Sequence, residues 1–413
     1  MKGRFIFAVI LTASTLYAQE PDSTPEPELA PSMYLMSLAS GTSLNPLAWP
    51  MPMMMQRKAS WTLMFMGQAF LVDTQQSGPR GADKLYSTNW GMASAQHSLG
   101  SGQVMFDSML SLEPATVTNR SYPLLFQTGE TAYGQPLKDE QHPHDFVMGL
   151  GAHYVLPVGE HTLLDFYYAA IGDPALGPVA FPHRASAAEL PQATIGHHWE
   201  DSTHIVSNVA TIGVKYRWIR LEASGFHGAE PNENRWNIDW GRMDSYSGRV
   251  SVLPSKNWTA QFSAARLTKP EALEAGDVVR TTASLQYTRL RSSGEAWSTS
   301  AIWGRNHKTA SQHETRYTNA WLLETVFPAT GKDFVTGRFE VAAKDELFAD
   351  QHDAFRVKAF TAGYTRDLAT KSNLQTGIGA NITGYVIPSA IQPAYGDHPW
   401  GVNVYFRIRL KRS

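Results

Sequence analysis

The 413-residue sequence has no cysteine, no long apolar run and almost no net charge, and each absence limits what the chain can be. Without cysteine, a lipid anchor attached to a cysteine is excluded. After the first 18 residues no stretch approaches the roughly 20 apolar residues that a membrane helix needs, which excludes a helical membrane protein. The formal net charge of -2 gives no electrostatic reason to expect nucleic acid as a partner.

The N-terminus has the layout of a secretory signal peptide. Lys2 and Arg4 precede a short apolar run, and the small residue Ala18 stands before Gln19. We therefore expect residues 1–18 to be removed during export. Residues 19–58 form a second region. Its first part, 19–32, is acidic and rich in proline, which predicts a disordered leader in the periplasm.

After residue 60 the sequence is rich in stretches in which apolar and polar side chains alternate. In the stretch 400–410 one face carries Val402, Val404, Phe406, Ile408 and Leu410, and the other carries Asn403, Tyr405, Arg407 and Arg409. An apolar face opposite a charged one is typical of a transmembrane β-barrel strand, which has lipid on one side and water on the other. The 12 Trp and 16 Tyr fit the same interpretation, because both residues favour membrane interfaces.

Sixteen such stretches can be distinguished. We predict strands at about 60–72, 84–96, 102–112, 144–156, 161–171, 204–216, 218–227, 245–253, 257–266, 278–289, 295–305, 316–327, 333–343, 355–366, 372–384 and 400–410. The links between them alternate between tight turns, such as 99–102 and 157–160, and long connections, such as 113–143 and 172–203.

This pattern predicts an all-β fold, an antiparallel up-and-down transmembrane barrel of about 16 strands over residues 59–413. Its short turns would be periplasmic and its long loops extracellular, in the outer membrane of a Gram-negative-type bacterium. The alternative is a soluble multi-sheet protein, which would need the same sixteen strands without a domain boundary. The methionine-rich segment 33–58 is apolar enough to pack, either as a plug in the barrel or as a strap across its mouth.

The inner face of the predicted barrel is charged. A charge facing lipid at mid-bilayer costs about 2 to 4 kcal/mol, so the charged phase of each strand is assigned to the lumen. This assignment gives seven lumen-lining residues: Arg220, Glu222, Arg280, Arg338, Glu340, Arg407 and Arg409. A barrel of about 16 strands is wide enough for an aqueous channel, whereas one of about eight is filled by side chains.

Histidines gather near carboxylates in three loop regions, which we expect to meet at the outer end of the barrel. The candidate metal ligands are His142, His144, His197, His198, His204 and His227. Imidazole and carboxylate suit zinc or copper, but no fixed zinc-motif spacing is present, and hydrogen bonding within the loops is the alternative. The thioethers of Met51, Met53, Met54, Met55, Met64 and Met66 suit Cu(I), although methionine also fills apolar gaps. We expect no other cofactor.

Three functions remain open. The first is a porin-like channel for small polar solutes or metal ions, with outer-membrane lipid as its surroundings. The second is an outer-membrane hydrolase with His, Asp or Glu at the rim; Ser202 lies beside Asp201 and His204, but neighbours on an extended chain point to opposite faces. The third is a structural or adhesion barrel. No catalytic residue is assigned.

Several strings resemble an uncharacterised family of bacterial outer-membrane porin-like β-barrel proteins. They are LSLEPATV (110–117), YPLLFQTGE (122–130), HPHDF (142–146), GHHWEDSTH (196–204) and EPNENRWNIDWGRMDSYSGR (230–249). The resemblance covers most of the chain after residue 60 and implies a fold and a location, but no activity for named residues. The barrel-assembly machinery is an expected partner, although Lys411, Arg412 and Ser413 follow Leu410 where such barrels commonly end on an aromatic residue.

Overall fold

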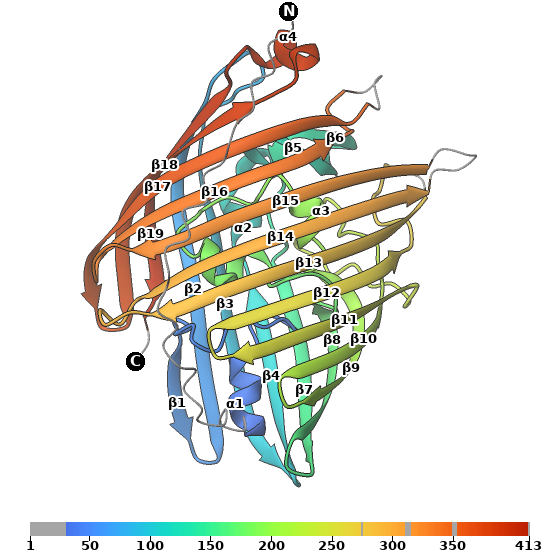
Figure 1. The fold of residues 1–413 in the computed structure, drawn as a ribbon, viewed down its shortest axis with the longest axis vertical. Helices are drawn as coiled ribbons and strands as arrows, with labels where there is room; N and C mark the ends of the chain where they lie inside the picture. Colours follow the sequence, from blue (N-terminus) through green and yellow to red (C-terminus); the bar gives the residue numbers. More distant parts are fainter. Residues whose placement is uncertain (1–29, 274–275, 310–314, 349–352, 412–413) are drawn as a thin grey trace, which may run out of the picture.

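The computed structural model describes residues 30–273, 276–309, 315–348 and 353–411. The predicted signal peptide, and the predicted leader up to residue 29, lie outside these ranges. In the described part sixteen antiparallel strands form a closed barrel, in which β19 pairs back to β2 (Figure 1). The predicted fold class and strand number are confirmed.

The barrel strands follow one another along the sequence. They are β2 (Trp61–Gln76), β3 (Lys84–Leu99), β4 (Gly102–Leu110), β7 (Val147–Val158), β8 (Thr162–Gly172), β9 (Val206–Tyr216), β10 (Ile219–Phe226), β11 (Ser245–Ser255), β12 (Trp258–Leu267), β13 (Asp277–Leu290), β14 (Ala296–Thr309), β15 (Thr315–Pro328), β16 (Asp333–Lys344), β17 (Phe355–Lys371), β18 (Leu374–Val386) and β19 (Trp400–Leu410). Each pairs with the next, so tight turns lie at one end and long connections at the other.

The alternation predicted for the last strand is present in β19. Val404 and Phe406 are 49% and 38% exposed, whereas Tyr405 and Arg407 between them are 1% and 0% exposed. On β13 the outward-facing Leu285 is likewise exposed. The outer wall is therefore apolar along the strands and the inner wall is polar, as a bilayer outside and polar contacts inside require.

One strand was not predicted. β1 (Met54–Lys58) forms a hairpin with Trp61–Phe65 at the start of β2, while β19 pairs with Gln68–Gln76 further along the same strand. The hairpin turns at Ala59, which has a φ of +53°. β1 therefore continues the barrel wall beyond the point where β19 ends, at the short-turn end.

The N-terminal segment, residues 31–48, fills the short-turn end of the barrel. It begins with α1 (Pro31–Ser37), whose Tyr34 and Leu35 are buried against Met64, Met105 and other inward residues. The Tyr34 hydroxyl donates a hydrogen bond to Asp165 of the wall at 2.8 Å. The structure thus has the plug arrangement for these residues, and Met64 serves as apolar packing.

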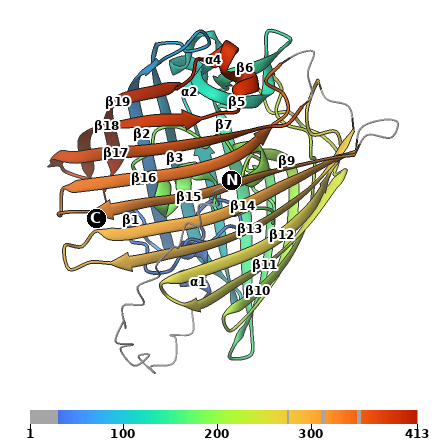
Figure 2. The same cartoon turned by 45° about the horizontal axis from the view of Figure 1, so that its top comes forward.

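A second interior element is the inner segment, residues 173–205, which connects β8 to β9. Almost all its residues are buried, and it contains η2 (Phe181–His183), η3 (Ala185–Ala187) and α3 (His197–Glu200). Figure 2 shows the strands wrapped around these interior elements. The sequence indicated a long extracellular loop here, but the segment folds into the barrel because its polar groups find partners on the inner wall.

The long-connection end carries further structure that was expected to be loop. Residues 111–146 contain α2 (Glu113–Thr116), η1 (Thr118–Arg120) and a separate hairpin of β5 (Tyr122–Ala132) and β6 (Gln135–Gln141). η4 (Ser389–Ile391) and α4 (Gln392–Tyr395) lie between β18 and β19. Phe126 of the hairpin stacks on Tyr395, with ring centroids 4.3 Å apart. Within the described ranges, none of the helices has the length and apolar character needed to cross a bilayer.

Candidate channel interior and histidine cluster

The seven residues predicted to line the lumen are all buried on the inner face of the wall. Arg220, Glu222, Arg280, Arg338, Glu340, Arg407 and Arg409 are each less than 9% exposed. Six of them contact an interior segment, and Glu222 pairs with Arg220 and Arg249 of the wall. Burial of so many charges is tolerated because each has an ionic or hydrogen-bonding partner.

Arg184 is the central anchor of the inner segment. Its Nε donates to Glu324 of β15 at 2.5 Å, and its Nη1 donates to Asp201 at 2.7 Å and to the carbonyl of Val179 at 3.0 Å. Glu324 also accepts a hydrogen bond from Arg338 of β16 at 3.1 Å. An arginine of the segment and one of the wall therefore share a single buried carboxylate.

A second group of ion pairs on the wall holds the N-terminal segment in place. Arg220 pairs with Asp165 at 2.6 Å, and Arg249 pairs with Glu222 at 3.0 Å. Both arginines also donate hydrogen bonds to the carbonyl of Thr42. Two neighbouring strands thus hold one backbone group of the N-terminal segment.

A third group lies on β19, where Arg407 and Arg409 both pair with Glu189 of the inner segment. Glu340 of β16 accepts a hydrogen bond from the backbone N–H of Ile195 at 2.6 Å. Arg280 of β13 donates to the hydroxyl of Ser202 at 2.8 Å. The inner segment is therefore bound to the wall along its length.

The two interior segments also contact each other. The Asn45 amide donates to the carbonyl of His183 at 2.9 Å and accepts from the N–H of Ala185 at 3.2 Å. Cavities between the segments and the wall measure about 10 to 30 Å³, which holds one or two water molecules. At these places the segments are packed against the wall.

Five of the six candidate histidines gather at the long-connection end. Their ring centroids are 6.3 Å apart for His142 and His198, 5.4 Å for His198 and His197, 5.4 Å for His197 and His204, and 5.5 Å for His204 and His144. The cluster adjoins the end of β14, because Asn306 donates to the His198 carbonyl at 3.0 Å. His227 is paired instead with Asp244, at 3.0 Å, on the connection between β10 and β11.

Each clustered histidine has a polar partner of its own. His144 lies 3.0 Å from Glu113, His197 lies 2.7 Å from Asp201, and the Nδ1 of His204 lies 2.7 Å from the carbonyl of Asp201. Ser202, once a candidate partner for His204, is bound by Arg280. The Ser202, Asp201 and His204 set therefore has no hydrogen bond between serine and histidine.

Burial and neighbouring charges shift the pKa values within the cluster in opposite directions. Burial lowers the pKa of His197 to about 4 despite the neighbouring Asp201, and it raises the pKa of Asp145 to about 7. For His144, burial is outweighed by Glu113, so its pKa is raised. For Glu130, burial is outweighed by Arg235 and then His142, so its pKa lies well below the usual value. The cluster therefore holds both neutral and charged histidines and carboxylates close together.

Sequence reasoning missed several residues of these sites. Asp165 and Glu324 occupy the inward phase of predicted strands, so the alternation could have identified them. Arg184, Glu189 and Glu130 are in connections without periodicity, and no local signal marks them. Their roles depend on partners that are distant in the sequence.

No protein-family model matches this sequence, and no curated protein matches it. Solved structures do share its fold. An anion-selective porin from Comamonas acidovorans has a TM-score of 0.53 and 13% identity, covering 85% of this chain and 99% of that one. OprB from Pseudomonas putida, in a high-pH structure, has a TM-score of 0.53 and 10% identity, covering 85% and 94%. OmpF from Salmonella typhi, in complex with daunomycin, has a TM-score of 0.52 and 9% identity, covering 86% and 100%.

At these identities the likeness concerns the fold. The fold is that of the bacterial outer-membrane porins, as the resemblance of the sequence implied. A closed barrel with an apolar outer wall, short turns at one end and long connections at the other is the architecture of outer-membrane proteins. The chain is accordingly a β-barrel of the bacterial outer membrane.

Proposed function

We propose that this protein is an outer-membrane channel of the porin type that is closed in the present conformation and conducts small polar solutes or metal ions when its interior segments move. The observation that carries the proposal is the attachment of the inner segment to the wall through buried ion pairs, foremost Arg184 with Glu324 and Arg407 with Glu189. Ion pairs and hydrogen bonds can exchange with water when a segment moves, whereas a wholly apolar plug would resist hydration.

The width of the barrel supports the same proposal. A wall of 16 strands can surround an aqueous channel once its interior segments are displaced. Its inner face would then present arginine and glutamate side chains to the solute, which suits polar cargo. Outer-membrane lipid and the barrel-assembly machinery are the further partners that the proposal includes.

The test uses the absence of cysteine, because an introduced pair can form only one intramolecular disulfide. The hydroxyl oxygens of Ser186 on the inner segment and Ser300 on β14 are 2.7 Å apart, so the double variant Ser186→Cys with Ser300→Cys would tie the segment to the wall. The matched control is Thr288→Cys with Ser298→Cys, whose hydroxyls are 3.0 Å apart and join two neighbouring wall strands.

In planar bilayers we expect openings from the wild type and from the reduced form of both double variants. Oxidation should abolish openings of the first variant and leave the control unchanged. Conductance by the oxidised first variant equal to that of the control would refute movement of the inner segment. Absence of conductance in the wild type and in every reduced variant would refute the channel itself.

A further inference from the structure

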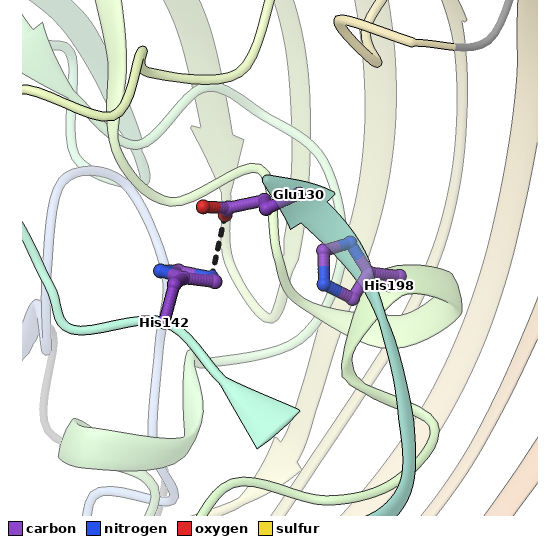
Figure 3. Close-up of side chains that lie close together, drawn as sticks. All are labelled: Glu130, His142 and His198. Atoms are coloured by element: carbon purple, nitrogen blue, oxygen red, sulfur yellow. Dashed lines mark ion pairs between the residues drawn. The ribbon is translucent and has the colours of Figure 1, made fainter. Parts of the chain in front are cut away.

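Three potential metal ligands from different parts of the chain meet at the long-connection end. Glu130 is on β5, His142 follows β6, and His198 is in α3 of the inner segment. One ligand atom from each lies within 4.8 Å of the others. Figure 3 shows the three side chains gathered around one space, with Glu130 and His142 in contact on one side and the His198 ring on the other.

The hydrogen bonding of His142 directs a lone pair into this space. Its Nδ1 lies 3.0 Å from the carbonyl of Pro143, which can only accept, so Nδ1 carries the proton. In the neutral ring Nε2 is then an acceptor, yet it lies 2.5 Å from an oxygen of Glu130 and makes no hydrogen bond. Two acceptors facing each other repel unless a proton or a metal ion lies between them, so this contact is one that a metal ion can occupy. A backbone carbonyl on the second nitrogen is also how metal-binding histidines are commonly oriented.

His198 is held beside the same space by the shape of the chain. Its Nδ1 lies 3.3 Å from Glu230, and its ring lies against Gly129. A Cβ added at Gly129 would lie 2.6 Å from the Nε2 of His198, and Gly129 has a φ of +103°, which strains any other residue. The glycine beside Glu130 therefore makes room for the imidazole.

The surroundings contain a surplus of buried acceptors. Oε2 of Glu230 and Oδ1 of Asp145 accept no hydrogen bond, in addition to the unpartnered Nε2 of His142. The positive charge of Arg235 is shared between Glu130 and Asp145. Buried acceptors without donors are costly, and a bound cation removes that cost.

We propose that Glu130, His142 and His198 bind one divalent transition-metal ion of the zinc or copper class, with a fourth position available to Glu230 or water. Two imidazoles with one carboxylate favour such ions over magnesium or calcium, which prefer oxygen ligands. With ligands at about 2.1 Å in a tetrahedral site, neighbouring ligand atoms are about 3.4 Å apart. Glu130 and His142 would separate by about 1 Å, and His198 would rotate inward by a similar amount.

The other clustered histidines are not part of the group whose ligand atoms lie close to one another among the described residues. Glu113 holds His144, and Asp201 contacts both His197 and His204. The bound ion would link the β5–β6 hairpin to α3, and so join the outer loops to the inner segment. The site does not depend on channel activity, since binding is measured without conductance.

The experiment is isothermal titration of the untagged, refolded full-length chain in detergent, after treatment with a chelator, with Zn(II) and with Cu(II). We expect one ion per chain. His142→Ala and His198→Ala should each weaken binding by at least about 100-fold, since even outer-shell changes cost up to that much. His227→Ala is the matched control, because it removes another histidine paired with a carboxylate at the same end, and it should bind as the parent does.

Glu130→Gln covers the case in which an alanine variant does not fold. It preserves shape and an acceptor for Arg235, and folding is checked by heat-modifiable migration on gels. In the parent, Co(II) should give the absorption of a four-coordinate site, which the glutamine variant should lose. No binding of Zn(II) or Cu(II) by the parent would overturn the proposal. Parent-like affinity in Glu130→Gln and in the folded histidine variants would overturn it as well.

Discussion

Removal of the Arg184 side chain should loosen the inner segment while leaving the wall closed. Arg184→Met preserves the aliphatic bulk but removes the donors to Glu324, Asp201 and Val179. Breaking a buried ion pair by removing one partner costs about 3 to 5 kcal/mol. Here Glu324 retains Arg338 and Asp201 retains His197, so no carboxylate is left without a partner.

The lower end of that range, about 3 kcal/mol, is therefore expected. It corresponds to about a 100-fold increase in the population of the displaced segment. The assay is the rate at which a maleimide labels a cysteine introduced at Ala187, which is 3% exposed on the inner segment. Because the natural chain has no cysteine, Cys introduced there is the sole target.

Two controls separate local movement from general destabilisation. Arg366→Met removes an exposed ion pair with Asp333 of 2.7 Å and should change labelling at Ala187→Cys by less than about fivefold, since water and salt screen such surface pairs. The second control is heat-modifiable migration on gels, which reports the closed wall and which Arg184→Met should leave unchanged. Equal labelling rates with Arg184→Met and Arg366→Met would refute the anchoring role of Arg184.

Three further outcomes are expected. Leu285→Arg, on the exposed face within β13, should lower the free energy of unfolding measured from the folded fraction on gels by about 2 to 4 kcal/mol, whereas Leu290→Arg at the strand end should lower it by about 0 to 1 kcal/mol. Equal effects of the two variants would contradict the lipid-facing register. Tyr34→Phe removes the hydrogen bond to Asp165 and should lower the free energy of unfolding in urea by about 1.5 to 3 kcal/mol. An unchanged urea midpoint would show that α1 does not contribute through this contact. Burial raises the pKa of Asp173 from 3.8 to about 8, so between these pH values the folded state retains a proton that the unfolded state has lost, and stability falls as pH rises. Asp173→Asn should therefore stabilise the protein by several kcal/mol at pH 8 and have little effect near pH 4. A stability difference that does not depend on pH would contradict this.

The barrel could be predicted because its signal is local. Residues such as Val404 and Arg407 report their environment through a period of two, and lipid on one side makes that period strict. The sixteen strands and their facing followed from this pattern alone. The extra strand β1 lacked the alternation, since its residues Gln56, Arg57 and Lys58 are exposed together.

The interior could not be predicted in the same way. Arg184 and Glu324 are 140 positions apart, and nothing near Arg184 in the sequence indicates that it is buried. The histidine pattern did lead to the cluster, and five of the six histidines lie together. Glu130 was missed because its partners, among them His142, His198 and Arg235, come from three separate segments.

The two interior segments meet at Asn45, and in the channel proposed above they would be two gates in series. The N-terminal segment lies at the short-turn end, and the inner segment runs along the wall from the long-connection end to Arg409 near the end of β19. In that channel solute would pass only when both have moved, and the free energy of opening both would be the sum of the two separate terms less the energy of their contact. Because the Asn45 amide bonds to His183 and Ala185 across the junction, displacement of one gate removes part of the support of the other. A stimulus acting on either side of the membrane would therefore lower the free energy of opening on the opposite side.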